Sequence, residues 1–241
     1  MEIHKPKAAH SWGEFAREIA TIVCGILIAL SLEEGVRAYH DRSVAEEARE
    51  NVRAEAQQNL EFIQARLVHE GCVDDRIAAL QTLLDKAGEG PIDHPPGAIG
   101  HPPTTPIFVE RWQAAAASGR SSLFAAQEQA QLDGLYGLFV RYNAHEDREQ
   151  AAWAHLRALE NWKGPIGPAA RISFAEALQE ARYEAWDLHF AGTMAERMAQ
   201  TLSIKPATGD ASDTAPASIC LPMTLTRAQA MQKLKEPFGE P

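Results

Sequence analysis

The chain has 241 residues, a formal net charge of -10 and a pI near 5.4. This acidic balance argues against a general nucleic-acid binder, because such proteins carry a basic surface that neutralises phosphates. Helix-favouring residues dominate outside two Pro/Gly-rich stretches, and β-branched residues are sparse after the first apolar run, so we expect an all-α fold.

The first predicted element is an apolar run from Ile19 to Leu32, within the stretch EFAREIATIVCGILIALSLEEG. As a helix this run of about 14 residues is about 21 Å long, which is short for a hydrocarbon core of about 30 Å. The window widens to residues 15–38 if Arg17 snorkels to the headgroups. We therefore predict a transmembrane anchor at 15–38, preceded by a short cytoplasmic arm at 1–14.

Aromatic residues flank this window, with Trp12 before it and Tyr39 after it. Tryptophan and tyrosine are enriched where a span meets the membrane interface, so we interpret this pair as interfacial anchors. Inside the window, Gly25 and Ala29 form a small-xxx-small pair on one helix face. Such a pair lets two spans approach closely and hints at a homo-oligomer.

Two other interpretations of the apolar run remain open. The small residues Ala29-Leu30-Ser31 resemble a signal-peptidase site, and a soluble core helix would also be apolar. Three acidic residues around the basic ones before the run weaken the signal-peptide interpretation. The helical pattern also continues past the run without a loop, so we favour an uncleaved anchor.

The orientation of the span is weakly determined by charge. Three basic residues on the N-terminal side, Lys5, Lys7 and Arg17, face three on the other side, Arg37, Arg42 and Arg49. We expect the N-terminus in the cytoplasm and the body in the periplasm of a bacterium, because the N-terminal arm is short and the body contains two cysteines that can pair.

These two cysteines are Cys72 and Cys220, and a third, Cys24, lies inside the apolar run. In an oxidising compartment Cys72 and Cys220 would form a disulfide that ties the C-terminal tail to the first long helix. Two buried free thiols are the alternative.

Residues 39–87 read as one long stalk or bundle helix with a break near Gly71, because apolar or small residues recur at helical spacing. Residues 88–104 are rich in Pro and Gly and contain HPP twice, at His94 and His101. Two histidines do not define a metal site, so we expect a stiff surface loop rather than a metal clip.

Residues 105–203 are predicted to form the helical bundle. Thr105 and Pro106 are placed to begin its first helix, and Ser173 with Glu176 reads as the capping box of a long helix ending near Ser203. Residues 204–241 are predicted to form a low-complexity loop and a short C-terminal helix that Thr226 and Gln229 cap.

No reaction-defining motif occurs in the sequence: there is no HExxH, Walker loop, GxGxxG, CxxC or GxSxG. The dense polar group His145-Glu146-Asp147, with Tyr142 nearby, is more simply a solvated helix face than a proton-transfer site. The tryptophans of the predicted bundle are better explained by core packing than by an apolar ligand pocket; they are Trp112, Trp153, Trp162 and Trp186. We therefore expect no catalytic, cofactor-binding or metal-binding residues, no cofactor, and a protein that is not an enzyme.

The pattern resembles an uncharacterised group of bacterial single-span membrane proteins. Their anchor motif is matched here by Arg17-Glu18-Ile19 and by residues 25–30, GILIAL, and a tryptophan followed by small residues and Ser-Gly is matched by Trp112 and Ser118-Gly119. The resemblance implies an uncleaved N-terminal anchor followed by a helical domain. It carries no activity.

The sequence thus predicts a single-pass inner-membrane protein with a periplasmic helical domain. Its partners would be the lipid bilayer and either further copies of itself or a larger membrane complex, in which it acts as a scaffold or accessory subunit without catalysis. A ligand-binding sensor bundle and, less simply, an enzyme with an unrecognised site are the alternatives.

Overall fold

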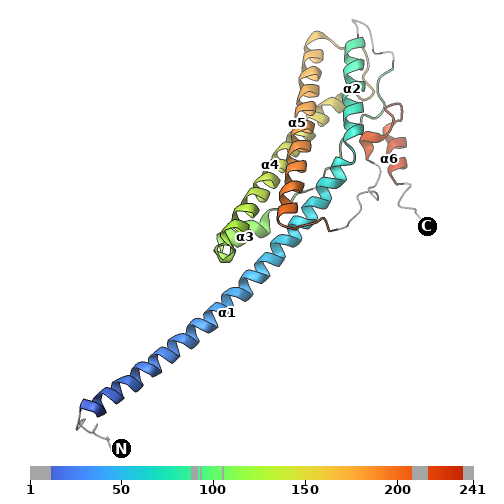
Figure 1. Ribbon diagram of the computed structural model, residues 1–241. Helices are drawn as coiled ribbons and strands as arrows, with labels where there is room; N and C mark the ends of the chain where they lie inside the picture. Colours follow the sequence, from blue (N-terminus) through green and yellow to red (C-terminus); the bar gives the residue numbers. More distant parts are fainter. Residues whose placement is uncertain (1–11, 88–91, 93, 105, 208–216, 236–241) are drawn as a thin grey trace, which may run out of the picture.

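A long helical arm joins a bundle of antiparallel helices (Figure 1). The structure, a computed structural model, describes residues 12–87, 92, 94–104, 106–207 and 217–235. The elements, where η marks a 3-10 helix, are α1 (Trp12–Leu67), α2 (Glu70–Lys86), α3 (Glu110–Ala117), η1 (Arg120–Leu123), α4 (Ala126–Leu156), η2 (Arg157–Leu159), α5 (Pro168–Thr201), η4 (Ser218–Cys220) and α6 (Arg227–Lys235). The predicted all-α fold is confirmed.

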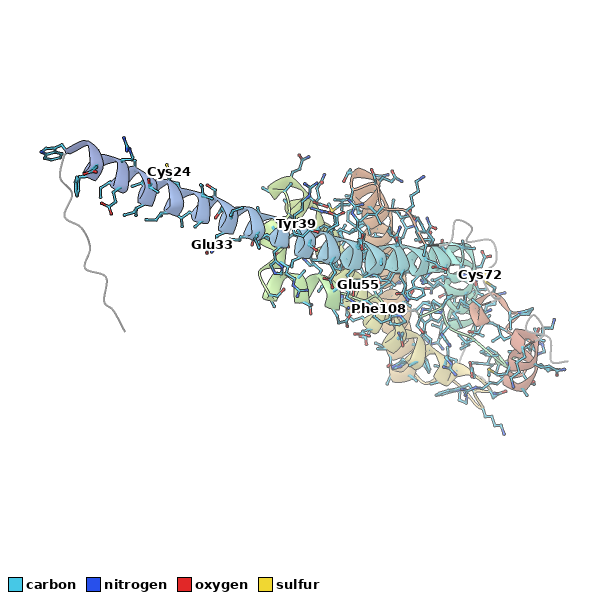
Figure 2. The ribbon with its side chains drawn as sticks, turned by 90° about the horizontal axis from the view of Figure 1, so that it is seen from below. Cys24, Glu33, Tyr39, Glu55, Cys72 and Phe108 are labelled. Atoms are coloured by element: carbon cyan, nitrogen blue, oxygen red, sulfur yellow. A yellow bond between two sulfur atoms is a disulfide. The ribbon has the colours of Figure 1, made fainter. Side chains whose placement is uncertain are left out.

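Helix α1 has 56 residues and changes its surroundings along its length. Its first buried side chain is Ala45, after which small and then larger apolar residues recur at helical spacing through Ile63. The part before Ala45 extends away from the bundle (Figures 1 and 2). The expected continuation of the apolar run into a packed helix is therefore correct.

The predicted break near Gly71 is also present, and it falls at Val68 and His69, between α1 and α2. The His69 Nδ1 atom hydrogen-bonds the Ala65 carbonyl at 2.8 Å. This contact satisfies one of the carbonyls that the end of α1 leaves without a helical partner.

Helices α4 and α5 form the most extensively packed pair, and both α1 and α2 lie against α5 (Figure 1). At Gly192 of α5 the backbone approaches α1 so closely that a β-carbon there would lie 2.9 Å from Ile63 Cγ2. Glycine at this position therefore allows the two helices to touch.

The buried apolar side chains divide into two clusters. The first, which we call the arm-side core, involves α1, α3, the first half of α4 and the end of α5. Its centre is aromatic: the ring of Tyr136 lies 5.7 Å from that of Trp112 and 5.3 Å from that of Phe139. The Tyr136 hydroxyl donates to the Val52 carbonyl at 2.8 Å, so a buried polar group is satisfied without water.

The second cluster, the disulfide-side core, involves α2, the end of α4, the start of α5 and two segments outside the α-helices, one of which contains η4. Its fully buried members include Leu80, Trp153 and Leu178 from the helices. Ile99 and Ile219 come from the two irregular segments and are equally buried.

Between the two cores lies a layer of buried charged side chains, the ionic layer: Arg66, His145, Glu146, Glu149, Glu184 and Asp187. On α5 this layer falls between Ala181 of the disulfide-side core and Leu188 of the arm-side core. Helices α4 and α5 therefore each carry an apolar, then a charged, then an apolar segment on the inner face.

The predicted start of the bundle at Thr105 and Pro106 is not where the first helix begins. Thr105 lies outside the described residues, and α3 starts at Glu110. Two asparagine side chains explain the difference. The amide of Asn59 bonds both the N–H and the C=O of Phe108, and the amide of Asn143 does the same with Ile107. These bonds replace the helical ones.

The predicted capping box at Ser173 is wrong, because α5 already begins at Pro168, with Gly167 before it in extended conformation. Proline is favoured at the first helical position and overrides the later serine. The Thr226 capping box is confirmed: the Gln229 side chain accepts from the Thr226 N–H at 2.9 Å and the Gln229 N–H donates to the Thr226 hydroxyl.

The segment 88–104 is not a surface loop throughout its described part. Pro96, Ala98 and Pro102 are buried, and Ile99 is fully enclosed. The reason is that α2 and the segment 217–226 cover it from both sides, and their polar atoms bond its backbone. His94 and His101, by contrast, are exposed.

Candidate functional site

The apolar arm of α1, residues 15–38, is the most unusual surface of the molecule (Figure 2). A window of this helix is long and apolar enough to cross a membrane, and none of that window is buried against the rest of the structure. Large apolar side chains such as Ile22, Leu27 and Leu32 are more than half exposed. Monomeric soluble proteins rarely leave so much apolar surface in water.

The two predicted interfacial residues mark the ends of this arm. Trp12 is 86% exposed and Tyr39 is 78% exposed. They lie about 40 Å apart along a helix that rises 1.5 Å per residue. This spacing equals the thickness of a bilayer including its headgroup regions, about 40–45 Å.

Gly25 and Ala29 lie within the arm, where a β-carbon on Gly25 would meet no atom within 4 Å. The small-residue face is therefore open to a neighbouring helix, and its role in packing stays a prediction. Cys24, beside it, is a free and exposed thiol.

At the opposite end of the molecule Cys72 and Cys220 are joined by a disulfide, with 5.0 Å between their Cα atoms, so the predicted pair is present. One turn later on α2, the buried guanidinium of Arg76 donates to four carbonyls, those of Ala98, Ile99, Ile219 and Leu221. Burial lowers the pKa of Arg76 from its ordinary value. The disulfide and the arginine together hold the C-terminal segment and the 96–103 loop against α2.

The interpretation of His145-Glu146-Asp147 as a solvated helix face is wrong for two of the three residues. His145 and Glu146 are buried, whereas Asp147 is exposed. The His145 ring lies between two carboxylates of α5, with Nδ1 on Glu184 at 2.5 Å and Nε2 on Asp187. Because both ring nitrogens are engaged, this histidine is not oriented toward a substrate.

Two arginines near the bundle surface complete this cluster. Arg148 bonds Glu184 at 2.7 Å and Arg141 bonds Asp187 at 2.7 Å. Burial alone would raise the pKa of Glu184, but hydrogen bonds from Arg148 and His145 outweigh it and lower that pKa below its usual value.

Arg66 and Glu149 form a deeper ion pair in the same layer, with 2.7 Å between Nη2 and Oε1 and exposures of 3% and 1%. Here burial dominates and raises the pKa of Glu149, although Arg66 opposes it. One oxygen of Glu149 and the hydroxyl of neighbouring Tyr142 find no hydrogen-bond partner among the described residues. Burial also raises the pKa of Tyr142.

A serine–histidine contact that the sequence did not suggest occurs between Ser173 Oγ and His155 Nε2, at 3.0 Å. A nucleophilic serine needs such a base, and the base in turn needs a group that orients it. Within the described part of the chain no acidic side chain bonds His155, whose ring instead meets Phe174 edge to face. The pair is also exposed to solvent.

The four tryptophans of the bundle have different environments. Trp112 belongs to the arm-side core and Trp153 to the disulfide-side core, as core packing predicts, and Trp162 packs partly buried against the latter. Trp186 does not: it is 60% exposed and stacks on Phe190 on the outer face of α5. The described residues contain no group of three or more His, Cys, Asp or Glu side chains placed to hold a metal ion.

Comparisons with known proteins add no relative: no family model, no curated protein and no solved structure matches this chain.

Proposed function

We propose that the protein is a single-span protein of a bacterial inner membrane, with its N-terminus in the cytoplasm and its helical bundle in the periplasm. We further propose that it acts there, without catalysis, as an oligomeric scaffold or as an accessory subunit of a larger membrane complex. The observation that carries the proposal is the fully exposed apolar arm, which continues without a break into a packed bundle.

A membrane explains this arm better than the other two interpretations. A soluble core helix would be buried, and this one is not. A signal peptidase requires extended chain, whereas Ala29, Leu30 and Ser31 lie in the middle of a continuous helix in which Ser31 Oγ donates to the Leu27 carbonyl. The Trp12 and Tyr39 rings fit the two interfaces by their spacing.

The disulfide supports a periplasmic bundle, because such bonds persist in oxidising compartments and are rare in the cytosol. A non-catalytic role is supported by the self-contained pairing of the buried charges: His145 is enclosed by Glu184 and Asp187, and Glu149 by Arg66. The open small-residue face at Gly25 favours assembly through the anchor.

The membrane location is tested by alkaline carbonate extraction of cells that express the full chain. We expect the protein in the pellet, and we expect the double variant Leu27→Lys/Ile28→Lys to be released, since each charge at the centre of a span opposes insertion by about 2.5–3.5 kcal/mol. Lysines at two exposed bundle positions, Gln127 and Gln150, are the control. Release of the wild type would refute the anchor.

The orientation is tested by a phosphatase that is active only in the periplasm, fused after Pro241. Activity is expected, and an inactive but well-expressed fusion would reverse the orientation.

The scaffold role is tested by mass measurement and pull-down after mild detergent extraction, with Gly25→Leu as the disrupting variant. A wild-type monomer with no stable partner would refute that role.

A further inference from the structure

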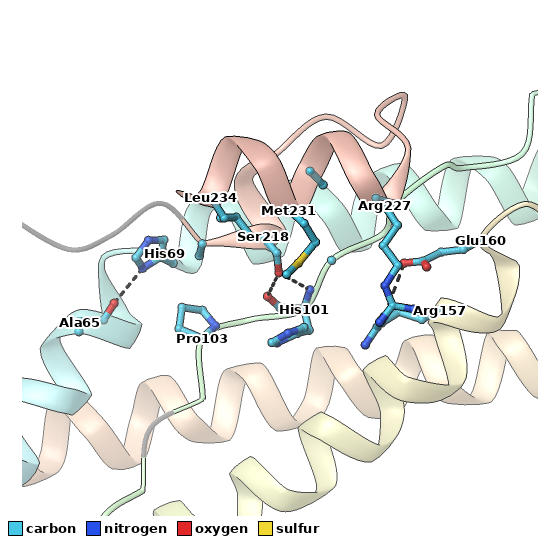
Figure 3. Close-up of a pocket in the computed structure, with 14 residues that line it drawn as sticks. Ala65, His69, His101, Pro103, Arg157, Glu160, Ser218, Arg227, Met231 and Leu234 are labelled. Atoms are coloured by element: carbon cyan, nitrogen blue, oxygen red, sulfur yellow. Dashed lines mark hydrogen bonds and ion pairs between the residues drawn. The ribbon is translucent and has the colours of Figure 1, made fainter. Parts of the chain in front are cut away.

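An open cavity of about 540 Å³ lies beside the disulfide-side core (Figure 3). Its walls come from segments far apart in the sequence: the end of α1, the 98–103 loop, η2, and the C-terminal segment with α6. Small-molecule sites in proteins have volumes of about 300–1,000 Å³. The volume of the cavity therefore suits a small-molecule ligand. The scaffold role proposed above does not require such a ligand.

Two glycines of the loop allow this cavity to form. A β-carbon on Gly97 would lie 2.4 Å from the Leu225 carbonyl oxygen, and one on Gly100 would lie 2.5 Å from that of Ser218. Gly100 also has φ +75°, which other residues rarely adopt. The loop and the C-terminal segment can therefore meet backbone to backbone and leave α6 as the outer wall.

One end of the cavity is positively charged. Arg227 of α6 reaches toward Arg157 of η2, and Glu160 lies beside them (Figure 3). Glu160 is 3.5 Å from Arg157 Nε, and its Oε1 also accepts the Ile99 N–H. Arg227 has no hydrogen-bond or ion-pair partner among the residues that the structure describes. The Glu160 carboxylate thus offsets the charge of Arg157, and the charge of Arg227 is left uncompensated.

The other end is apolar. Met231 and Leu234, one turn apart on α6, face Pro103 of the loop, and alanines at 65, 98, 217 and 230 line the remainder. The two histidines there have their Nδ1 atoms on backbone carbonyls: His69 on Ala65 and His101 on Pro102. Each Nδ1–H group is therefore used in a hydrogen bond to a nearby backbone carbonyl.

We propose that this cavity binds an amphiphilic monocarboxylate, with its head between Arg157 and Arg227 and its aliphatic tail along Met231 and Leu234. Guanidinium groups bind carboxylates by paired, charge-assisted hydrogen bonds. A singly charged head matches the one uncompensated positive charge, and an apolar wall behind it selects for a tail. Such a site is what the alternative of a ligand-binding bundle would require.

The bound acid would also fasten α6. This helix buries one side chain, Ala230, and makes its few contacts with η4. A carboxylate that bonds Arg227 and Arg157 together links α6 to η2. Ligand binding should therefore slow hydrogen exchange in α6 more than in α4 or α5.

The test uses the full chain in nanodiscs and sodium octanoate as the probe, followed by calorimetry, with empty nanodiscs as the blank for partition into lipid. We expect saturable binding at one site. Acetate, which lacks the tail, and octanol, which lacks the charge, should bind at least tenfold more weakly. The absence of saturable binding, or octanol that binds as well as octanoate, would overturn the proposal.

Arg227→Gln should weaken octanoate binding about tenfold, equivalent to about 1.4 kcal/mol, and should abolish the protection of α6. Lys233→Gln is the matched control, because it removes the same charge from the same helix at an exposed position that does not line the cavity. Equal losses in the two variants would mean that net charge, and not the site, governs binding, and would refute the proposal. Exchange in α4 and α5 reports whether each variant is folded.

Discussion

The two cores of the bundle are closed in different ways. The arm-side core lies between long helices whose backbones are internally bonded, and side chains such as Asn59 and Asn143 fix the extended residues 107–108 against it. The disulfide-side core is closed by the segments 96–103 and 217–226, in which the short 3-10 helix η4 is the one regular helix and most backbone groups have no helical partner.

Buried backbone carbonyls need partners wherever they lie. On the disulfide side a single arginine supplies four of them with hydrogen bonds, and the disulfide fixes the same segment four residues away on α2. An irregular cover can therefore replace a helix when long-range polar contacts and a covalent bond compensate for the missing backbone hydrogen bonds of a helix.

Arg76→Met should have the largest effect, because it leaves four carbonyls without their donor. We expect the free energy of local opening on the disulfide side to fall by about 3–5 kcal/mol. Hydrogen exchange of the full chain in nanodiscs measures this at residues 97–101 and 219–221. Amides of α1 near Val52, in the arm-side core, should keep their protection. Lys86→Met, an exposed change on the same helix, is the control, and an equal effect there would contradict the role of Arg76.

Variants of the ion pair of Arg66 and Glu149, between the two cores, distinguish the cost of an unpaired buried charge from the value of the pair itself. Arg66→Met or Glu149→Leu alone should destabilise the bundle by about 3–5 kcal/mol, because each leaves an unpaired buried charge. The double variant should be near neutral, since apolar residues can fill the same space. Urea unfolding of the four proteins in mild detergent gives the coupling energy. Additive single effects would show that the pair does not act as a unit.

Cys72→Ser should lower stability by about 2–4 kcal/mol, since the bond closes a loop across 148 residues. The loss should appear in hydrogen exchange at 217–226 and in α2 and leave the arm-side core protected. Because Arg76 holds the same segment, the double variant Cys72→Ser/Arg76→Met should lose less than the sum of the two. Cys24→Ser, which removes a free thiol, is the control.

The long helices were predictable because their signals are local, and the cysteine pair was predictable because the sequence has only two cysteines outside the apolar run. Apolar spacing along α1, α4 and α5 records which face is buried, and helix ends such as Thr226 are encoded within four residues. The late start of α3 was not predictable in this way, because Asn59 and Asn143, which hold Ile107 and Phe108 extended, come from helices that are distant in sequence.

The ionic layer was missed although the sequence contains a signal for it. On α5, Glu184 falls on the same helical stripe as Ala181, Leu188 and Ala191, which are buried. A carboxylate on an apolar stripe indicates a buried charge that needs a partner. The partners come from the stretch around His145 on α4. Taken without α5, that stretch has the polar pattern of a solvated helix face. The burial of residues 96–102 likewise depends on Arg76, which the Pro/Gly pattern does not reveal.

Glu149 and Glu184 should give stability opposite dependences on pH, although they belong to one layer. The pKa of Glu184 is lowered in the folded state, so its contribution is present above its unfolded pKa, about 4.3, and is lost as pH falls through the folded value. The pKa of Glu149 is raised, so the folded state binds its proton more readily and stability falls as pH rises from about 4.3 to the folded value.

The opposite pH dependences of Glu149 and Glu184 can be measured directly, and we expect this effect to be the smallest of those predicted. The thermal midpoint of the full chain in mild detergent, recorded from pH 3.5 to 7, should fall less steeply toward acid in Glu184→Gln than in wild type, and more steeply in Glu149→Gln. The slope is the readout, because both variants also lower stability at neutral pH. The exposed change Glu176→Gln should leave the slope unchanged. If both buried variants shift the slope in the same direction, the two carboxylates share one environment, and the separation into a deep pair and a near-surface cluster is wrong.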